Sequence, residues 1–298
     1  MATVSDLPQS ELPSQPQPPE TGGEPVPPRW LTEARGLRVV WERELIRFVR
    51  NRLRILTSLA QPVLFLFVLG TGLTRITSAN AGFDFRTFMF PGIVAMTVMF
   101  TAIFSAVSIV WDREFGFLRE MLVAPISRSA ILVGKILGGS TVATLQGVLM
   151  LLFAGAVHVP YDPILLLTLV GEMALAAIMV TSVGVLLASS ITQMEAFQAV
   201  LQFVAMPMFF LSGAMFPTTG LPSWLDVLTR IDPLTYAVDP MRRVVFDHIN
   251  APAAVVQELA PGVSWGSWTL GTPAELGLLV VVAVAALFGA VKRFQRTE

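Results

Sequence analysis

The stretch WDREFGFLREMLVAPISRSAILVGK, from Trp111 to Lys135, lies between two long runs of uncharged hydrophobic residues. The whole chain is only 14% charged, yet this stretch holds seven charged residues: Asp112, Arg113, Glu114, Arg119, Glu120, Arg128 and Lys135. Charged side chains are costly inside a lipid bilayer. We therefore expect the stretch to lie in water and to connect two membrane-spanning helices.

A short helix is predicted inside this stretch, over 112–123. Asp112 and Glu114 suit its start, because acidic side chains interact favourably with a helix N-terminus, and Pro125 ends it. An apolar stripe at a spacing of three and four residues is formed by Phe115, Leu118 and Leu122. Two interpretations stay open: a solvated loop helix, or a helix that docks into a groove of a soluble partner.

The composition indicates an integral membrane protein. The chain has 298 residues, of which 54% are hydrophobic, and its mean hydropathy is +0.67. It contains no cysteine, which excludes disulfides and thiolate metal sites, and a net charge of −1 gives no reason to expect nucleic acid. Residues 1–28 are rich in proline and polar residues, so we expect a disordered tail without a signal peptide.

Six charge-poor runs are long enough, or nearly so, to cross a bilayer as helices. They predict spans at about 55–75, 87–111, 130–157, 163–190, 195–215 and 269–292. Before them, residues 31–54 carry an apolar face opposite a row of arginines, which indicates a helix lying in the membrane interface. The sequence thus predicts an all-α integral membrane protein whose transmembrane domain covers 29–298.

The positions of Lys and Arg predict the orientation, because positive charge is retained in the cytoplasm. With both termini inside, 15 of the 20 cations fall in the segments at 29–54, 113–135 and 292–296, and five fall in outer loops. The expected location is therefore a cell membrane, with both termini cytoplasmic. The long outer segment 216–269 has two apolar faces separated by Pro233 and predicts a re-entrant helical hairpin; a hairpin lying flat on the surface is the alternative.

Several kinds of chemistry lack their usual motif. There is no phosphate-binding G-x-x-x-x-G-K-[ST] stretch, so we expect no ATPase site in this chain, and no catalytic residue or metal centre is predicted, because the two histidines are far apart. The ionisable residue well inside a span is Glu172, which could bind a cationic substrate or carry a proton. It could equally be structural, with Gln146 or a hydroxyl as partner. A possible substrate path is assigned to Glu172, Gln198, Gln202 and Phe203.

Three glycines near the start of the third predicted span have the small-xxx-small spacing that allows close helix contacts. They are Gly134, Gly138 and Gly139. We expect the third span to approach a neighbouring helix closely there.

Two patterns carry a family resemblance. The first is E-x-G-x-x-x-E-x-L-x-x-P over 114–125, followed by Gly134 and Lys135. The second is FLSGAMFP over 210–217, then Leu221, Pro222, Trp224 and Leu225, then PLTY over 233–236 with Asp239 and Arg242. Together with the six spans, they resemble the permeases of type-2 ABC exporters, and daunorubicin-resistance-type permeases most of all. The resemblance covers about Arg29 to the C-terminus.

The resemblance implies a half-transporter that works as two permease copies, expected to be a homodimer, with two copies of a separate ATPase chain. That partner would bind ATP and Mg²⁺, so no cofactor is expected on this chain. Coupling to the ATPase is implied for eight residues: Asp112, Glu114, Gly116, Phe117, Arg119, Glu120, Leu122 and Pro125. The resemblance also implies an outer motif of ten residues: Ser212, Gly213, Phe216, Pro217, Pro222, Trp224, Pro233, Tyr236, Asp239 and Arg242.

The predicted function is therefore efflux of a hydrophobic or amphipathic compound, either a drug or antibiotic, as in multidrug resistance, or a lipid. The spans are rich in phenylalanine and contain little to bind sugars, which favours this class over carbohydrates. Three alternatives stay open: an ABC exporter of polysaccharide or another polymer, a proton-coupled secondary transporter that uses Glu172, and a membrane scaffold without transport. The sequence names neither the substrate nor the role of the proline-rich tail.

Overall fold

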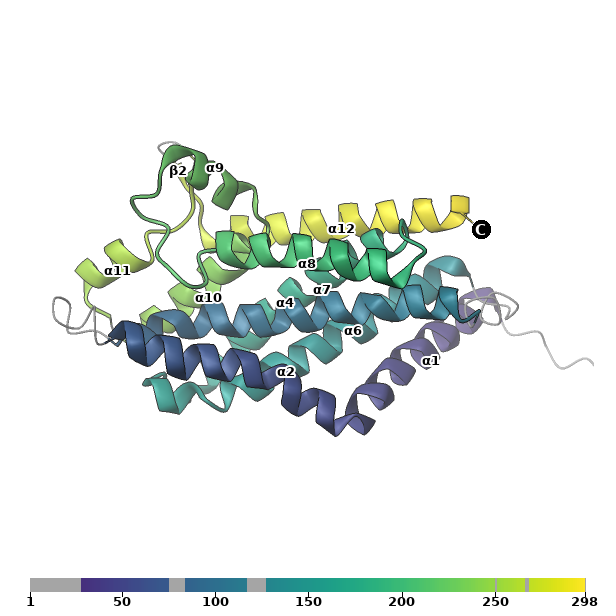
Figure 1. The fold of residues 1–298 in the computed structure, drawn as a ribbon, viewed down its shortest axis with the longest axis horizontal. Coiled ribbons are helices and arrows are strands. Elements are labelled where there is room, and N and C mark those ends of the chain that lie inside the picture. Colours follow the sequence, from purple (N-terminus) through teal and green to yellow (C-terminus); the bar gives the residue numbers. More distant parts are fainter. Residues whose placement is uncertain (1–27, 75–83, 117–126, 250, 266–267, 298) are drawn as a thin grey trace, which may run out of the picture.

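The computed structural model describes residues 28–74, 84–116, 127–249, 251–265 and 268–297 (Figure 1). Six of the helices in this part of the chain are long and apolar enough to cross a membrane. They are α2 (Arg52–Leu64) continued by the π-helical η3 (Phe65–Leu69) to Thr74, α4 (Phe85–Glu114), α6 (Arg128–Leu151), α7 (Pro163–Ala188), α8 (Met194–Leu211) and α12 (Thr272–Thr297). The predicted all-α membrane protein is confirmed.

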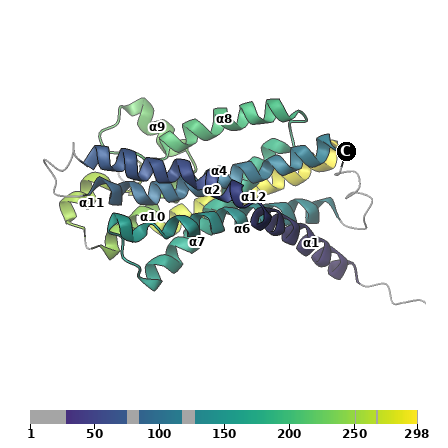
Figure 2. The same cartoon turned by 60° about the horizontal axis from the view of Figure 1, so that its bottom comes forward.

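The spanning helices run side by side along the long axis of the molecule (Figures 1 and 2). Helix α1 (Arg29–Arg50) and the C-terminus lie at one end, which we call the α1 end. Helices α9 (Ser223–Ile231) and α11 (Ala253–Leu259) and the hairpin of β1 (Ser264–Trp265) and β2 (Trp268–Thr269) lie at the other, the α9 end. Between the third and fourth spans, the 3-10 helix η4 covers Ala154–Val157.

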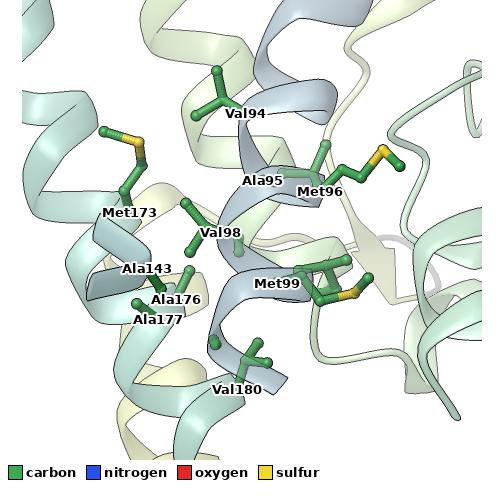
Figure 3. Close-up of a cluster of buried hydrophobic side chains, with 14 of the residues drawn as sticks. Val94, Ala95, Met96, Val98, Met99, Ala143, Met173, Ala176, Ala177 and Val180 are labelled. Atoms are coloured by element: carbon green, nitrogen blue, oxygen red, sulfur yellow. The ribbon is translucent and has the colours of Figure 1, made fainter. Parts of the chain in front are cut away.

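Helices α4, α6 and α7 all pack against one another and form a well-packed part of the bundle (Figure 3). Small and flexible buried side chains meet there: Val98 of α4, Ala143 of α6, and Met173, Ala176, Ala177 and Val180 of α7, whereas Met96 and Met99 of α4 point away from α6 and α7. Alanines let helices approach closely, and methionines fill the irregular gaps that remain. In a bilayer this close packing, more than removal from water, is what holds helices together.

Side-chain caps explain where several helices begin. Asp84, Ser127 and Asp162 each accept a hydrogen bond from a backbone N–H in the first turn of α4, α6 and α7. Asn51 does the same for α2, since its side chain accepts from the backbone N–H of Arg54. The predicted interfacial helix over 31–54 therefore ends earlier, at Arg50, and the four residues that follow belong to the cap and first turn of the first span.

The glycines of α6 make close contacts, as the sequence predicts. A Cβ atom on Gly134 would lie 3.0 Å from the Leu37 carbonyl oxygen, and one on Gly138 would lie 2.8 Å from Glu44 Cβ, both in α1. A Cβ on Gly139 would lie 2.2 Å from Ser105 Oγ of α4. The prediction is confirmed, and one of the neighbours is the non-spanning helix α1.

The segment between the fifth and sixth spans contains α9, α10 (Thr235–His248) and α11. Helix α10 is largely buried and packs against α4, α7 and α12. Helix α9 is mostly exposed and packs against α8. The two helices at the predicted hairpin therefore have different environments, and only the second is enclosed by the spans.

Candidate functional site

A cavity of about 680 Å³ opens on the side of the bundle towards the α1 end. Helices α2 and α8 flank α4, which forms the back wall, and the end of α1 contributes the side chains nearest the α1–α2 junction. Several lining residues are exposed, among them Gln61, Phe104 and Gln202, so the cavity is open at the surface of the subunit.

The lining changes from charged to apolar along the cavity. Arg47, Asn51 and Arg54 lie at the α1–α2 junction. Hydroxyl and amide side chains follow on α2 and α8: Thr57, Ser58, Gln61, Gln198 and Gln202. The walls nearer the middle of the spans carry no charge and combine the apolar Pro62, Met96, Phe100 and Met206 with the hydroxyl groups of Thr97 and Thr101. Such a gradient suits a molecule that is polar at one end and apolar at the other.

The four residues predicted to form a substrate path are not brought together. Gln198 and Gln202 line the cavity. Phe203, one position further along α8, is 80% exposed and is absent from the lining, because it points from another face of the helix. Glu172 is absent from the lining too, since it is buried within α7.

Glu172 is held inside the bundle. It is only 4% exposed, and its Oε2 atom has no hydrogen-bond partner among the described residues. The expected partner Gln146 donates instead to the Ile55 carbonyl oxygen at 3.2 Å and to Ser58 Oγ at 2.8 Å. Gln146 therefore joins α6 to the first span, and pairing of Gln146 with Glu172 was a wrong expectation.

A cluster of charged side chains joins three helices at the α1 end. Lys135 Nζ of α6 lies 2.5 Å from Asp112 Oδ2 and 3.1 Å from Ser108 Oγ, both in α4. Arg43 of α1 lies 2.9 Å from Asp112 Oδ2, and Glu44 Oε1 lies 3.7 Å from Lys135 Nζ. Lys135 and Asp112 are buried, which makes their mutual neutralisation a requirement of the fold.

The position of Asp112 differs from the sequence expectation. Helix α4 continues without a break through Asp112 to Glu114 and ends at Phe115, followed by Gly116 at a positive φ of 79°. No helix begins at Asp112, because nothing in the sequence interrupts α4 there. The remaining residues assigned to coupling lie outside the described part of the chain: Phe117, Arg119, Glu120, Leu122 and Pro125.

The outer motif separates into a buried part and an exposed part. Arg242 of α10 is buried; its guanidinium lies 4.1 Å from the centroid of the Phe88 ring and donates to the Gly213 carbonyl oxygen at 2.6 Å. Burial lowers the pKa of Arg242 to about 10, so it stays charged at neutral pH. Tyr236 donates to the Arg230 carbonyl oxygen at 2.6 Å. These contacts fix α10 against α4 and against the turn after α8.

The other residues of the outer motif differ in how far they are buried. Ser212 is buried and donates to the Phe209 carbonyl oxygen, and Asp239 pairs with Arg243. Pro222 and Trp224 are exposed, the latter by 66%. Phe216, Pro217 and Pro233 are half-buried. The buried part is structural, whereas the exposed residues at the start of α9 are free to contact lipid or another chain.

The sequence interpretation missed the charge cluster. Arg43 was assigned to an exposed basic face and Lys135 to a solvated loop, because their partners lie on helices distant in sequence. It also missed Glu275, which is completely buried and pairs with Arg243 at 3.0 Å. A usable signal was present, since Asp112 and Lys135 each occur at the end of a hydrophobic run where a charge can be paired.

Taken together, six spans, an amphipathic helix at one end and a side cavity define a multi-pass membrane protein of the transporter class. The family model described as ABC-2 type transporter matches residues 35–246, and the chain belongs to that family. It is therefore a membrane permease subunit of an ABC transporter, and the family implies an ABC ATPase as partner.

Curated relatives agree with this assignment. "Putative transport permease ycf38" of Cyanophora paradoxa is 29% identical over 210 residues, 69% of this chain and 72% of the relative. Nodulation protein J of Rhizobium leguminosarum bv. trifolii is 28% identical over 212 residues, 70% of this chain and 80% of the relative. "Probable multidrug ABC transporter permease YbhR" of Escherichia coli (strain K12) is 31% identical over 168 residues, 55% of this chain and 45% of the relative.

Proposed function

We propose that the chain is the permease subunit of an ATP-driven exporter of a hydrophobic or amphipathic compound, a drug or a lipid. The observation that carries the proposal is the side cavity, whose lining changes from charged at the α1–α2 junction to apolar near the middle of the spans. A molecule that enters such a cavity from one leaflet keeps its polar end in contact with polar side chains while its apolar part moves against the apolar wall. The multidrug name of the YbhR relative supports the drug class.

A second copy of the chain is proposed to close the cavity. Its lining includes exposed polar side chains such as Gln61 and Gln202, which would be costly against lipid. The helices that flank it are also poorly covered within one subunit: 17% of the span containing α2 and 28% of α8 are buried, against 67% of α4. Two copies facing each other would enclose one shared path.

The α1 end is proposed to face the cytoplasm, where two ATPase chains bind ATP and Mg²⁺. Helix α1, which lies at this end, carries Arg43, Arg47 and Arg50, and Arg54 follows in the first turn of α2, in agreement with retention of positive charge on the cytoplasmic side. The ATPase would dock on the connection between α4 and α6. Asp112 and Lys135 lie on the two helices that this connection joins, so the charge cluster would pass its movement to α1.

The alternatives have less support. A proton-coupled transporter using Glu172 requires that residue to reach the substrate path, and Glu172 does not line the cavity. Export of a polysaccharide would favour aromatic platforms, and the two tyrosines, Tyr161 and Tyr236, are both absent from the lining.

The test is efflux from cells that express the chain together with its ATPase. The accumulation of a panel of cationic, neutral and anionic lipophiles is followed, with vanadate or a protonophore added. We expect vanadate to stop efflux and the protonophore to leave it unchanged. Loss of efflux with the protonophore alone would reject ATP-driven export, and failure to export any lipophile would reject the proposed substrate class.

A further inference from the structure

The charged mouth of the cavity has an excess of positive charge. Two arginines line it, Arg47 near the end of α1 and Arg54 in the first turn of α2, and both are exposed. Neither forms an ion pair within the described residues. Their guanidinium groups are therefore available to a ligand, and each offers several N–H donors in a planar arrangement that matches phosphate or carboxylate oxygens.

The acidic side chain in the lining does not cancel this charge. Within the described lining, that acid is Glu44, which is 8% exposed. Its Oε1 atom lies 3.7 Å from Lys135 Nζ and 3.6 Å from Arg43. Although Oε1 accepts no hydrogen bond within the described residues, the cluster holds two cations, Arg43 and Lys135, for the carboxylates of Glu44 and Asp112, so the mouth keeps the charge of Arg47 and Arg54.

Neutral donors and apolar side chains line the same cavity as the two arginines. The side-chain amides of Gln61 and Gln198 have no hydrogen-bond partner within the described residues and can donate to ester or hydroxyl oxygens. Beyond them, Met96 and Phe100 provide apolar surface. Positive charge, neutral donors and apolar surface thus follow in the order in which an anionic lipid carries its phosphate, its glycerol and its tail.

We propose that the cavity binds an amphiphile with an anionic headgroup, with the headgroup oxygens on Arg47 and Arg54 and the tail against Phe100 and Met96. This inference rests on the proposed function and narrows its substrate class. It replaces the cationic substrate expected from Glu172, because that residue is absent from the lining and the lining arginines favour the opposite charge.

Two other arginines provide a matched control, which separates binding inside the cavity from general attraction of an anionic probe to a positively charged surface. Arg50 and Arg52 lie between the two lining arginines in sequence and are exposed, but neither lines the cavity. Arg50→Gln with Arg52→Gln removes the same charge from the same junction as Arg47→Gln with Arg54→Gln. A difference between the two pairs therefore reports on the cavity alone.

The binding test uses the full chain in neutral detergent, without the ATPase. Because the chain has no native cysteine, a single cysteine at Thr57, an exposed residue of the cavity lining, can carry a bimane fluorophore. The probes are oleoyl lysophosphatidylglycerol and oleoyl lysophosphatidylcholine, which share a tail and differ in headgroup charge. We expect the anionic probe to bind about tenfold more tightly, as two charge-assisted contacts suggest. Free glycerol phosphate, which lacks the tail, should not displace it at equal concentration.

The variants decide whether the cavity arginines are responsible. Arg47→Gln with Arg54→Gln should reduce the preference to about twofold or less, because it weakens the anionic probe more than the zwitterionic one, whose choline cation no longer faces two positive charges. The Arg50/Arg52 control should keep the preference. Equal binding of both probes by the unmodified chain would overturn the inference, as would equal loss in the two double variants or displacement by glycerol phosphate alone. These binding results do not test the proposed function. That function is rejected by a different result, the absence of ATP-driven export.

Discussion

Lys135 Nζ lies 2.5 Å from Asp112 Oδ2, so that the buried start of α6 is joined to the buried end of α4 by an ion pair at the two ends of the charged connection. Arg43 forms a second ion pair with Asp112, and Glu44 lies near Lys135. A buried charge that loses its partner is costly. The cluster therefore requires α1, α4 and α6 to keep their relative positions at this end of the bundle.

The first prediction concerns this pair. Lys135→Met leaves Asp112 with Arg43 only and should lower the free energy of unfolding by about 1 to 3 kcal/mol, and Asp112→Leu should cost a similar amount, because it leaves buried Lys135 with only Glu44 nearby. The double variant should cost clearly less than the sum. Denaturant unfolding of the purified chain in detergent measures all three. Strict additivity would show that the pair does not interact.

The second prediction tests close packing at the α9 end. A Cβ atom on Gly92 of α4 would lie 2.2 Å from the Ala214 carbonyl oxygen, whereas Gly277 of α12 has no atom within 4 Å of such a Cβ. We expect Gly92→Ala to destabilise the chain by about 2 kcal/mol or more, and Gly277→Ala to stabilise it by about 0.5 to 1 kcal/mol, because alanine is the better helix former. Melting temperatures in detergent give both values, and equal effects would contradict the packing.

The third prediction concerns pH. Burial raises the pKa of Asp232, between α9 and α10, to about 8, although its Oδ1 accepts from the Leu234 backbone N–H. Because its folded pKa lies above the unfolded value of 3.8, the folded state binds the proton more tightly, and stability falls as pH rises from about 4 towards 8. A shift of this size corresponds to a cost of about 6 kcal/mol for ionising Asp232 in the folded chain.

Asp232→Asn should remove that dependence in thermal melts from about pH 4 to 9, and it should be more stable than the unmodified chain at pH 8 to 9. Asp226→Asn is the control, because Asp226 lies on neighbouring α9, is less buried and pairs with Arg230. If Asp232→Asn follows the unmodified chain at every pH, Asp232 does not titrate as described.

The fourth prediction concerns orientation. With the α1 end cytoplasmic, a cysteine at exposed Ser223 of α9 should react with an impermeant maleimide on intact cells. A cysteine at exposed Arg35 of α1 should react only after permeabilisation. The absence of native cysteine makes the signal specific. Labelling of the Arg35 position on intact cells would reverse the orientation.

Hydrophobic runs were sufficient to predict the number of spans, because length and apolar composition alone decide whether a helix can cross a bilayer. They were less informative about boundaries. The α1–α2 break depends on the cap at Asn51, and the end of α4 depends on Gly116, both local features that periodicity does not reveal.

The site was harder to predict, because its residues meet across helices. Gln198 and Gln202 were identified because amides in a span must find partners, but Phe203, the residue after Gln202, faces elsewhere. Arg47 and Arg54 looked like an interfacial anchor, and only the fold places them at the mouth of the cavity. The position of Glu172 similarly depends on which face of α7 is turned inwards.

The most direct test of the account is to fill the cavity and measure transport. Proteoliposomes containing the chain and its ATPase are given ATP and a fluorescent lysophospholipid, and three chains are compared: unmodified, Thr101→Trp in the cavity wall, and Leu167→Trp at an exposed position of α7 outside the cavity. We predict that Thr101→Trp reduces ATP-dependent transport by about tenfold or more while Leu167→Trp leaves it unchanged. Equal transport by Thr101→Trp and the unmodified chain would contradict the claim that substrate passes through this cavity.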